Sequence, residues 1–263
     1  MTKLHALAKI NLALVVGPKR SDGKHEVATV LQAVDLADRI SLEPAPALEV
    51  AGFPEDTLVR DALLALSDAA RVEPGWSVQI EKKIPVAAGL GGGSSDAAAA
   101  LRLANETLAS PLAPVRLHEI AATVGADVPF FLTGGTQLGT GDGSELEPVD
   151  LPDAYAVLLL LPREASKSST ADVYAAFTGE HAFEERRAQL RAALDARDLA
   201  ALPPNDLASS SLAQELTDTG AFRADVSGAG PAVYGLFADR DRAASVRARF
   251  ADHCATWLTA PAW

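Results

Sequence analysis

Apolar and polar side chains alternate along residues 7–16, and this period of two residues predicts a β-strand. Ile10, Leu12 and Leu14 fall on one face of the strand, whereas Lys9 and Asn11 fall on the other. The pattern therefore places a lysine and an asparagine side by side on one strand face. A solvated lysine on an edge strand is the alternative interpretation.

The remaining periodicity predicts a mixture of strands and helices. Extended patterns occur at residues 26–41, 76–80, 155–161, 232–237 and 255–259. Apolar positions three and four apart predict helices at residues 56–71, 96–105, 115–124, 182–199, 207–216 and 240–251. Helices packed on a sheet give an α+β fold class. The turn sequence at residues 151–153 predicts a boundary between residues 1–150 and 151–263.

Composition and charge narrow the classes of partner. The chain has 263 residues, of which 48% are hydrophobic, and its longest apolar run, residues 154–161, is too short to span a bilayer. The formal net charge of −12 disfavours nucleic acid as a partner. The single cysteine forms no internal disulfide, and the five histidines lack metal-ligand spacing. We therefore expect a cytoplasmic protein without membrane segment or structural zinc.

A glycine-rich segment, here called the glycine loop, is the main candidate for anion binding. It consists of Pro85, Val86, Ala87, Ala88, Gly89, Leu90, Gly91, Gly92, Gly93, Ser94 and Ser95. Glycines let the backbone approach an anion, and the N–H groups at the start of the following helix point at the charge. No lysine follows the glycines, as a Walker A loop would require, and Ser94 replaces the third glycine of a dinucleotide fingerprint. A plain strand-to-helix turn is the alternative.

Other groups could complete an anion site. Lys9, Lys82 and Lys83 are candidate cations, although the latter two also suit a solvated strand end. Asp127 lies between a helix stop and an apolar segment, so it is either a helix N-cap or a functional carboxylate. A second glycine turn, residues 226–231, precedes the strand at 232–237. Together these features begin to resemble the parts of one site.

Five segments carry a family resemblance. They are residues 8–12 (Ala-Lys-Ile-Asn-Leu), 22–26 (Asp-Gly-Lys-His-Glu), the glycine loop, 125–129 (Gly-Ala-Asp-Val-Pro) and 227–230 (Ser-Gly-Ala-Gly). In this order they resemble the motifs of the GHMP kinase superfamily over nearly the whole chain. The resemblance implies a two-domain α+β fold, with an N-terminal domain like ribosomal protein S5 and a C-terminal ferredoxin-like α/β sandwich.

The resemblance also implies a reaction. Lys9 and Asp127 correspond to the family's catalytic pair, and the glycine loop would wrap the phosphates of ATP. Asp127 would accept the proton of an attacking hydroxyl or orient that hydroxyl, while Lys9 would keep Asp127 ionised and neutralise charge near the transferred group. Asn11 would bind substrate or fix Lys9. Mg2+ would be carried by the nucleotide, with no protein ligand assigned.

Within the superfamily, the motifs are most similar to kinases that phosphorylate the 2-hydroxyl of a cytidine diphosphate sugar alcohol for isoprenoid synthesis by the non-mevalonate route. His25 would bind the cytosine edge, and Tyr174 would supply an aromatic face. The chain departs from the pattern at Lys24, where the family usually has a tyrosine that stacks on the base, and it lacks a further aromatic residue near Leu31. Lys24 would lay its stem on the base or contact the diphosphate.

Alternatives remain open at this point. Another small-molecule kinase of the superfamily is one, and Lys24 is its best support. A non-catalytic nucleotide-binding module is a second, which the presence of Lys9, Asp127 and the glycine loop together disfavours. The absence of the third glycine of the dinucleotide fingerprint disfavours a third alternative, a nicotinamide dehydrogenase. The partners expected are ATP and the small-molecule substrate, with no nucleic acid and no membrane, and the chain is expected to be a monomer or weak homodimer.

Overall fold

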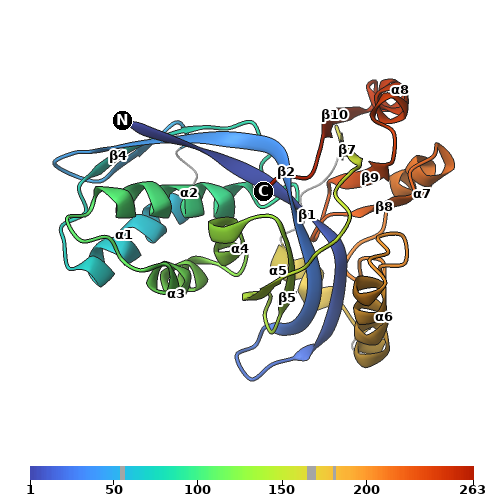
Figure 1. Cartoon of the computed structure of the whole chain (residues 1–263), viewed down its shortest axis with the longest axis horizontal. Helices are drawn as coiled ribbons and strands as arrows, with labels where there is room; N and C mark the ends of the chain where they lie inside the picture. Colours follow the sequence, from blue (N-terminus) through green and yellow to red (C-terminus); the bar gives the residue numbers. More distant parts are fainter. Residues whose placement is uncertain (54–56, 165–169, 180–181) are drawn as a thin grey trace. The chain divides into compact units, whose positions relative to one another are not determined.

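The structure is a computed structural model that describes residues 1–53, 57–164, 170–179 and 182–263. Figure 1 labels most of its elements along the chain. They are β1 (Thr2–Lys19), β2 (His25–Pro44), β3 (Glu49–Ala51), α1 (Leu58–Ala70), β4 (Trp76–Glu81), α2 (Gly92–Thr107), α3 (Pro114–Val124), α4 (Val128–Thr133), β5 (Thr136–Thr140), β6 (Glu145–Pro148), β7 (Ala156–Pro162), α5 (Thr170–Ala176), α6 (Phe183–Asp195), α7 (Ser211–Asp218), β8 (Arg223–Val226), β9 (Val233–Phe237), α8 (Arg240–Phe250) and β10 (Cys254–Thr259).

The chain divides into two compact units. The first consists of Met1–Ala8, Leu36–Val86 and Gly91–Gly134, and the second of Lys9–Asp35, Ala87–Leu90 and Gly135–Trp263. Strands β1 and β2, which pair with each other, therefore contribute residues to both units.

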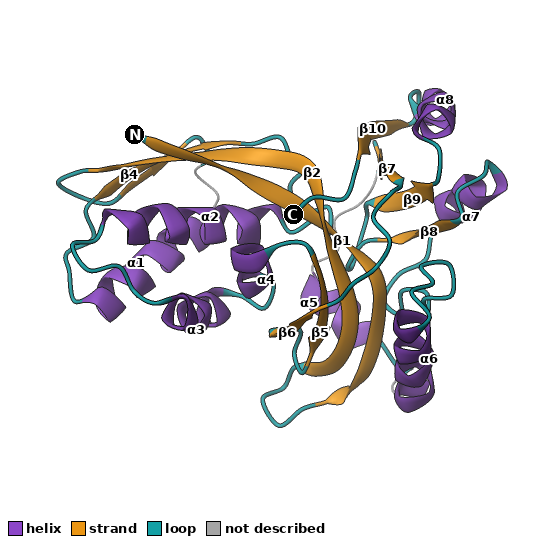
Figure 2. Ribbon diagram, in the orientation of Figure 1, coloured by secondary structure: helices purple, strands orange, loops and turns teal. Residues whose placement is uncertain are grey.

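The first unit packs helices on one face of a small sheet (Figure 2). Residues 39–44 of β2 pair antiparallel with β4, and β3 pairs parallel with β4. Ile40 and Leu42 of β2 point into a core that also contains the apolar faces of α1 to α4. Helix α2 is buried along most of its length, and its run of alanines leaves room for neighbouring helices on more than one side. This packing fixes the end of the glycine loop, since the loop runs directly into α2.

The second unit contains the ferredoxin-like part that the family resemblance implies. Its four-stranded sheet has the order β10-β7-β9-β8 with every pair antiparallel, and helices connect β7 to β8 and β9 to β10. That β-α-β-β-α-β arrangement is the ferredoxin-like one. Apolar side chains of α7 and α8 pack in one core with those of the sheet. Residues 29–32 of β2 also pair with β5 in this unit.

Most of the elements expected from periodicity are present, and the α+β class is confirmed. The helix expected at 207–216 begins only at Ser211, because the Ser210 side chain accepts a hydrogen bond from the Leu212 N–H and caps the helix there. Periodicity missed β3, β5, β6, β8 and the short helices α4 and α5. Residue 56, the expected start of the first helix, lies outside the described residues. The division into residues 1–150 and 151–263 stays a prediction. No helix in the described part of the chain has the length and apolar character needed to cross a membrane.

Candidate active site

Lys9 and Asn11 lie on one face of β1, as the alternation predicts, and both are about 4% exposed. The Lys9 Nζ atom donates a 2.6 Å hydrogen bond to Asn11 Oδ1, and Asn11 Nδ2 donates to Thr29 Oγ1 at 2.8 Å. Thr29 in turn donates to the Ala13 carbonyl at 2.8 Å. This chain fixes the Asn11 amide with its oxygen toward the lysine. The interpretation of Lys9 as a solvated edge lysine is therefore excluded.

The middle of the glycine loop is anchored through three consecutive carbonyl groups. The pairs are the Ala232 N–H with the Ala88 oxygen at 3.0 Å, the Ser227 Oγ with the Gly89 oxygen at 2.8 Å, and the Lys9 N–H with the Leu90 oxygen at 3.0 Å. In a trans peptide unit the next N–H points away from the carbonyl. The N–H groups of residues 89–91 consequently point away from these anchors.

The sign of φ alternates along the loop backbone, as it does in anion-binding concavities. The φ angles of Ala87, Gly89 and Gly91 are +52°, +81° and +71°, whereas Ala88 and Leu90, which alternate with them, have negative φ. A residue with positive φ beside one in the right-handed helical region gathers successive N–H groups on one side, an arrangement called a nest, and the alternating sign of φ in this loop suits it. Ala87 adopts this conformation despite its Cβ, so the surrounding structure must hold it there.

Gly89 is required by a close approach as well as by its φ angle. A Cβ at this position would overlap the Ser227 carbonyl oxygen. Ser227 is fully buried, and its Oγ accepts a 3.3 Å hydrogen bond from the Asn11 N–H while donating to the Gly89 carbonyl. The second glycine turn thus contacts both the glycine loop and β1.

In the first unit, a buried charge cluster fixes the start of the glycine loop. The Lys82 Nζ lies 2.6 Å from a carboxylate oxygen of Asp38 and 2.6 Å from one of Asp96, and both aspartates are fully buried. Asp38 also accepts hydrogen bonds from the N–H groups of Lys83 and Ile84. Burial opposes the charge on Lys82, but Asp96 and Asp38 outweigh burial and raise the pKa of the lysine.

This cluster joins the end of β4 to the first turns of α2. Gly92, the first residue of the helix, lies so close that a Cβ there would be 3.3 Å from Lys82 Nζ and 3.1 Å from Ile84 Cγ2. Lys82 therefore forms ion pairs with two carboxylates, whereas the side chain of Lys83 is exposed. The start of α2 contains no acidic residue in its first turn, which suits an anion at its N–H groups.

Asp127 occupies the N-cap position of α4 in the first unit, but its side chain makes no capping hydrogen bond. Its backbone is right-handed, with φ −84° and ψ −14°, rather than the extended conformation usual for a capping aspartate. The Gly125-Ala126-Asp127 segment instead turns directly into the helix, with the Val128 N–H donating to the Gly125 carbonyl at 3.1 Å. The helix-cap interpretation of Asp127 is therefore not supported.

His25 lies in the second unit with its ring among aromatic side chains. The ring is 5.8 Å from that of Tyr174 and 6.1 Å from that of Phe177, measured between centroids. Nδ1 lies 2.7 Å from the Gly17 carbonyl oxygen, which can only accept, so Nδ1 carries a hydrogen. Nε2 is buried and has no hydrogen-bond partner among the described residues. In the neutral ring, Nε2 is consequently an acceptor available for a ligand.

Lys24 contacts an acidic side chain that the sequence analysis did not single out. Its Nζ lies 2.5 Å from Asp142 Oδ2, at the turn between β5 and β6. Burial opposes ionisation of Asp142, but hydrogen bonds from Lys24 and Ser144 outweigh it and lower the pKa of this carboxyl to about 2. The expected contact of Lys24 with a base or a diphosphate stays a prediction.

The structure thus places the predicted site residues in two sets. Lys9, Asn11 and residues 87–90 of the glycine loop are brought together in the second unit, which also holds His25, Tyr174 and Lys24. Asp127 and the remaining loop residues belong to the first. Sequence reasoning missed four supporting residues, namely Thr29, Asp38, Asp96 as a partner of Lys82, and Asp142. It did single out the second glycine turn, which contains Ser227.

Comparison with known proteins identifies the family. The model of the GHMP kinases N terminal domain matches residues 57–135, and that of the GHMP kinases C terminal domain matches residues 181–256. A 4-diphosphocytidyl-2-C-methyl-D-erythritol kinase of Geobacter sulfurreducens is 40% identical, over 98% of this chain and 96% of its own length. The chain belongs to the GHMP kinase family.

A further relative and two solved structures also match over most of the chain. A 4-diphosphocytidyl-2-C-methyl-D-erythritol kinase of a Synechococcus species is 40% identical over 95% of this chain and 89% of its own. A crystal structure of 4-(cytidine 5'-diphospho)-2C-methyl-D-erythritol kinase superposes with a TM-score of 0.83 at 29% identity, covering 100% of both chains. The mevalonate kinase of Methanococcus jannaschii, at 14% identity and a TM-score of 0.76 over 100% of this chain and 98% of its own, shares the fold.

Proposed function

We propose that this protein transfers the γ-phosphoryl group of ATP to the 2-hydroxyl of 4-diphosphocytidyl-2-C-methyl-D-erythritol. Identity of about 40% to kinases of this name over nearly the whole chain is the observation that carries the assignment. The site described above supports it, because it offers an anion-binding loop, a buried lysine and a polar ring nitrogen among aromatic side chains.

The nucleotide end of the reaction is assigned to the glycine loop. The loop combines left-handed residues at 87, 89 and 91 with the N-terminal end of α2, and both features favour bound phosphate. The chain's net charge of −12 makes such local groups necessary, since the overall field repels a triphosphate. ATP is the phosphoryl donor that the family uses.

The substrate end is assigned to His25, Tyr174 and Lys24. A cytosine carries an exocyclic amino group, which can donate to the Nε2 atom that has no partner among the described residues. The ring of Tyr174 is close enough to His25 to offer an aromatic face to the same base. In the sequence, Lys24 was the best support for a different substrate. Its ion pair with Asp142 explains the presence of the lysine without a different substrate.

The chemistry is assigned to Lys9 and Asp127. Phosphoryl transfer needs mostly positioning and charge stabilisation, so a buried ammonium fixed by Asn11 suits the charge on the transferred group. We assign to Asp127 the acceptance of the hydroxyl proton or the orientation of the hydroxyl.

Mg2+ carried by the nucleotide would supply positive charge that neutralises the phosphates during transfer. The described residues contain no group of three or more His, Cys, Asp or Glu that could hold a metal ion. In the proposal Mg2+ is carried by the nucleotide, and no protein ligand is assigned to it.

The test is an ATP-consumption assay with four acceptors, namely 4-diphosphocytidyl-2-C-methyl-D-erythritol, mevalonate, homoserine and galactose. Product formation on the first acceptor alone, confirmed by phosphorus NMR of the new phosphate monoester, is the expected result. Turnover of only one of the other three would overturn the substrate assignment. ATP binding without turnover of any acceptor would favour a nucleotide-binding module instead.

A further inference from the structure

We infer that Asn205 is a positioning residue for the glycine loop and acts through the second glycine turn. The inference rests on the proposed function, because it assigns the residue a role in holding the ATP-binding loop. Asn205 lies between α6 and α7 and belongs to none of the motifs that carried the family resemblance.

The Asn205 amide holds the second glycine turn on both sides of Ser227. Nδ2 donates to the Val226 carbonyl at 2.9 Å and to the Gly228 carbonyl at 2.7 Å. Oδ1 accepts from the Leu207 N–H at 2.8 Å. Reversing the amide would point its oxygen at two carbonyls, so only this orientation satisfies every group. The carbonyls of the residues before and after Ser227 are therefore fixed by one side chain.

Ser227 transmits this constraint to the glycine loop. Its hydroxyl donates to the Gly89 carbonyl at 2.8 Å, and the Ala232 N–H that follows the turn donates to the Ala88 carbonyl at 3.0 Å. A shift of the turn would therefore move the loop's peptide units, whose N–H groups we assign to phosphate binding. Ser227 also accepts from the Asn11 N–H at 3.3 Å, and Asn11 fixes Lys9. The same turn thus supports both the loop and the buried lysine.

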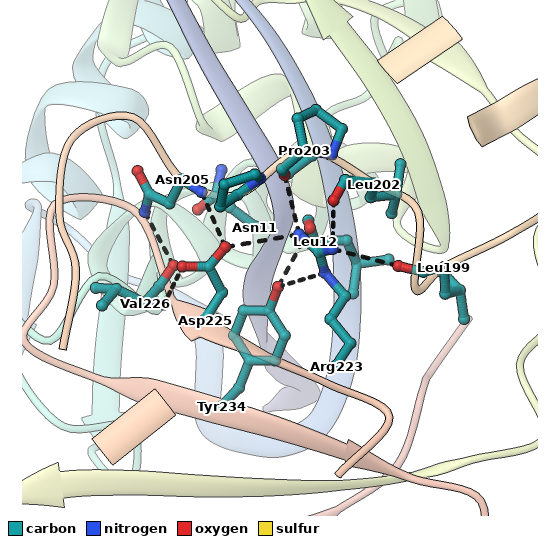
Figure 3. A network of polar contacts seen from close by, with 12 residues as sticks. Asn11, Leu12, Leu199, Leu202, Pro203, Asn205, Arg223, Asp225, Val226 and Tyr234 are labelled. Atoms are coloured by element: carbon teal, nitrogen blue, oxygen red, sulfur yellow. Dashed lines mark hydrogen bonds and ion pairs between the residues drawn. The ribbon is translucent and has the colours of Figure 1, made fainter. Parts of the chain in front are cut away.

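Asn205 is itself anchored by a buried polar network, which Figure 3 shows. The Asn205 N–H donates to Asp225 Oδ2 at 2.8 Å. Arg223, about 8% exposed, donates to the carbonyls of the segment that leads to Asn205. These bonds run to Leu202 at 2.6 Å, Pro203 at 3.0 Å and Leu199 at 3.3 Å.

The network ends on β1. Arg223 Nε donates to the Tyr234 hydroxyl at 3.3 Å, and that hydroxyl donates to the Leu12 carbonyl at 3.2 Å, one residue after Asn11. Asn205 and the segment before it are thus held by side chains of β8, the strand that leads into the turn. Asn205 anchored in this way fixes the position of the second glycine turn, because neither the segment around Asn205 nor the turn can shift without breaking buried hydrogen bonds.

The experiment compares Asn205→Ala with Asn105→Ala, a matched control in the first unit. Asn105 also bridges backbone groups, accepting from the Leu112 N–H at 2.8 Å and donating to its carbonyl at 3.1 Å, far along α2 from the glycine loop. Both variants are expected to unfold at lower temperature. Asn205→Ala alone is expected to lower kcat by about tenfold or more and to weaken binding of a non-hydrolysable ATP analogue, because a small displacement of positioning groups costs rate steeply.

A double-mutant cycle separates positioning from general stabilisation. If Asn205 acts through Ser227, then Asn205→Ala added to Ser227→Ala should lower kcat little further. Multiplicative effects of the two substitutions, or unchanged kcat and analogue affinity in folded Asn205→Ala, would overturn the inference. The analogue measurement needs no acceptor, so a wrong acceptor assignment would show in the wild-type turnover assay and leave this test intact.

Discussion

The Nζ atom of Lys9 lies 2.6 Å from the Oδ1 atom of Asn11, two positions further along the same strand. Both side chains are buried, so the ammonium has little water around it and depends on protein oxygens. Asn11 is held in turn by Thr29 and by the backbone contact with Ser227. The asparagine therefore orients the lysine, and this relationship can be tested apart from the lysine itself.

Asn11→Leu should lower kcat by about tenfold to a hundredfold, because it removes the oxygen that orients the ammonium group. Asn11→Asp keeps that oxygen and should retain more activity than Asn11→Leu. Steady-state kinetics of both variants, with unfolding temperatures measured alongside, check this. Equal activities of the two variants would argue that the Asn11 oxygen has no such role.

Asp127→Asn should reduce kcat by about a hundredfold or more while ATP affinity stays near that of the wild type, as expected for loss of a group that accepts or orients a proton. Turnover under saturating substrate and equilibrium binding of an ATP analogue are the two measurements. A near-normal rate would show that Asp127 is an ordinary residue at the start of α4 with no role in the reaction.

Lys82→Met should destabilise the folded protein by about 3 kcal/mol, because it leaves the buried carboxylates of Asp38 and Asp96 without their counter-charge. Lys83→Met is the control, since Lys83 is exposed and binds Asp38 through its backbone N–H. Urea unfolding of both variants measures the difference. A loss no larger than that of the control would show that the cluster contributes little.

The same cluster predicts an alkaline pH dependence. The pKa of Lys82 is raised above its ordinary 10.5 in the folded state. The stabilisation is therefore fully present below that ordinary value and is lost as the pH rises through the folded pKa. Urea unfolding at increasing pH should show the wild type approaching Lys82→Met in this alkaline range, whereas a constant difference would contradict the assignment.

Lys24→Met should destabilise the protein by less than about 1 kcal/mol at neutral pH, since the lysine is largely exposed. The pKa of Asp142 is lowered from 3.8 to about 2, so the stabilisation is present above pH 3.8 and is lost as the pH falls toward 2. Unfolding free energies measured on descending from neutral pH should converge for the two proteins. Arg39→Met, which removes the exposed pair with Glu81, is the control.

A uridine analogue of the substrate should be used at least about tenfold less efficiently than the cytidine compound, measured as kcat/KM. The Gly17 carbonyl holds the hydrogen on Nδ1 of His25, so the Nε2 of the neutral ring can accept from an amino group but cannot donate to the uracil oxygen. His25→Phe should reduce this preference. Equal use of both nucleotides by the wild type would contradict the role given to His25.

The sequence was most informative where neighbouring residues share one element. The period of two placed Lys9 beside Asn11, and the glycine loop was located together with the helix that follows it. The sequence could not predict that Lys82 pairs with Asp38 and Asp96, because those partners lie on different elements and each of the three residues suits a solvated surface equally well. Asp142 was hidden for a different reason. Its glycine-rich surroundings gave no strand signal, although β5 and β6 pair there.

The interleaving of the two compact units along the chain limits how this protein can be divided. Residues 85–86 and 91–95 of the glycine loop belong to the first unit and residues 87–90 to the second, and β1 is likewise shared. No single cut in the chain therefore yields one complete unit. Recombination with a related gene at residue 150 would exchange most of the second unit while leaving residues 9–35, 87–90 and 135–150 behind. Such hybrids inherit mismatched contacts around Ser227, so these segments are expected to be exchanged together or not at all.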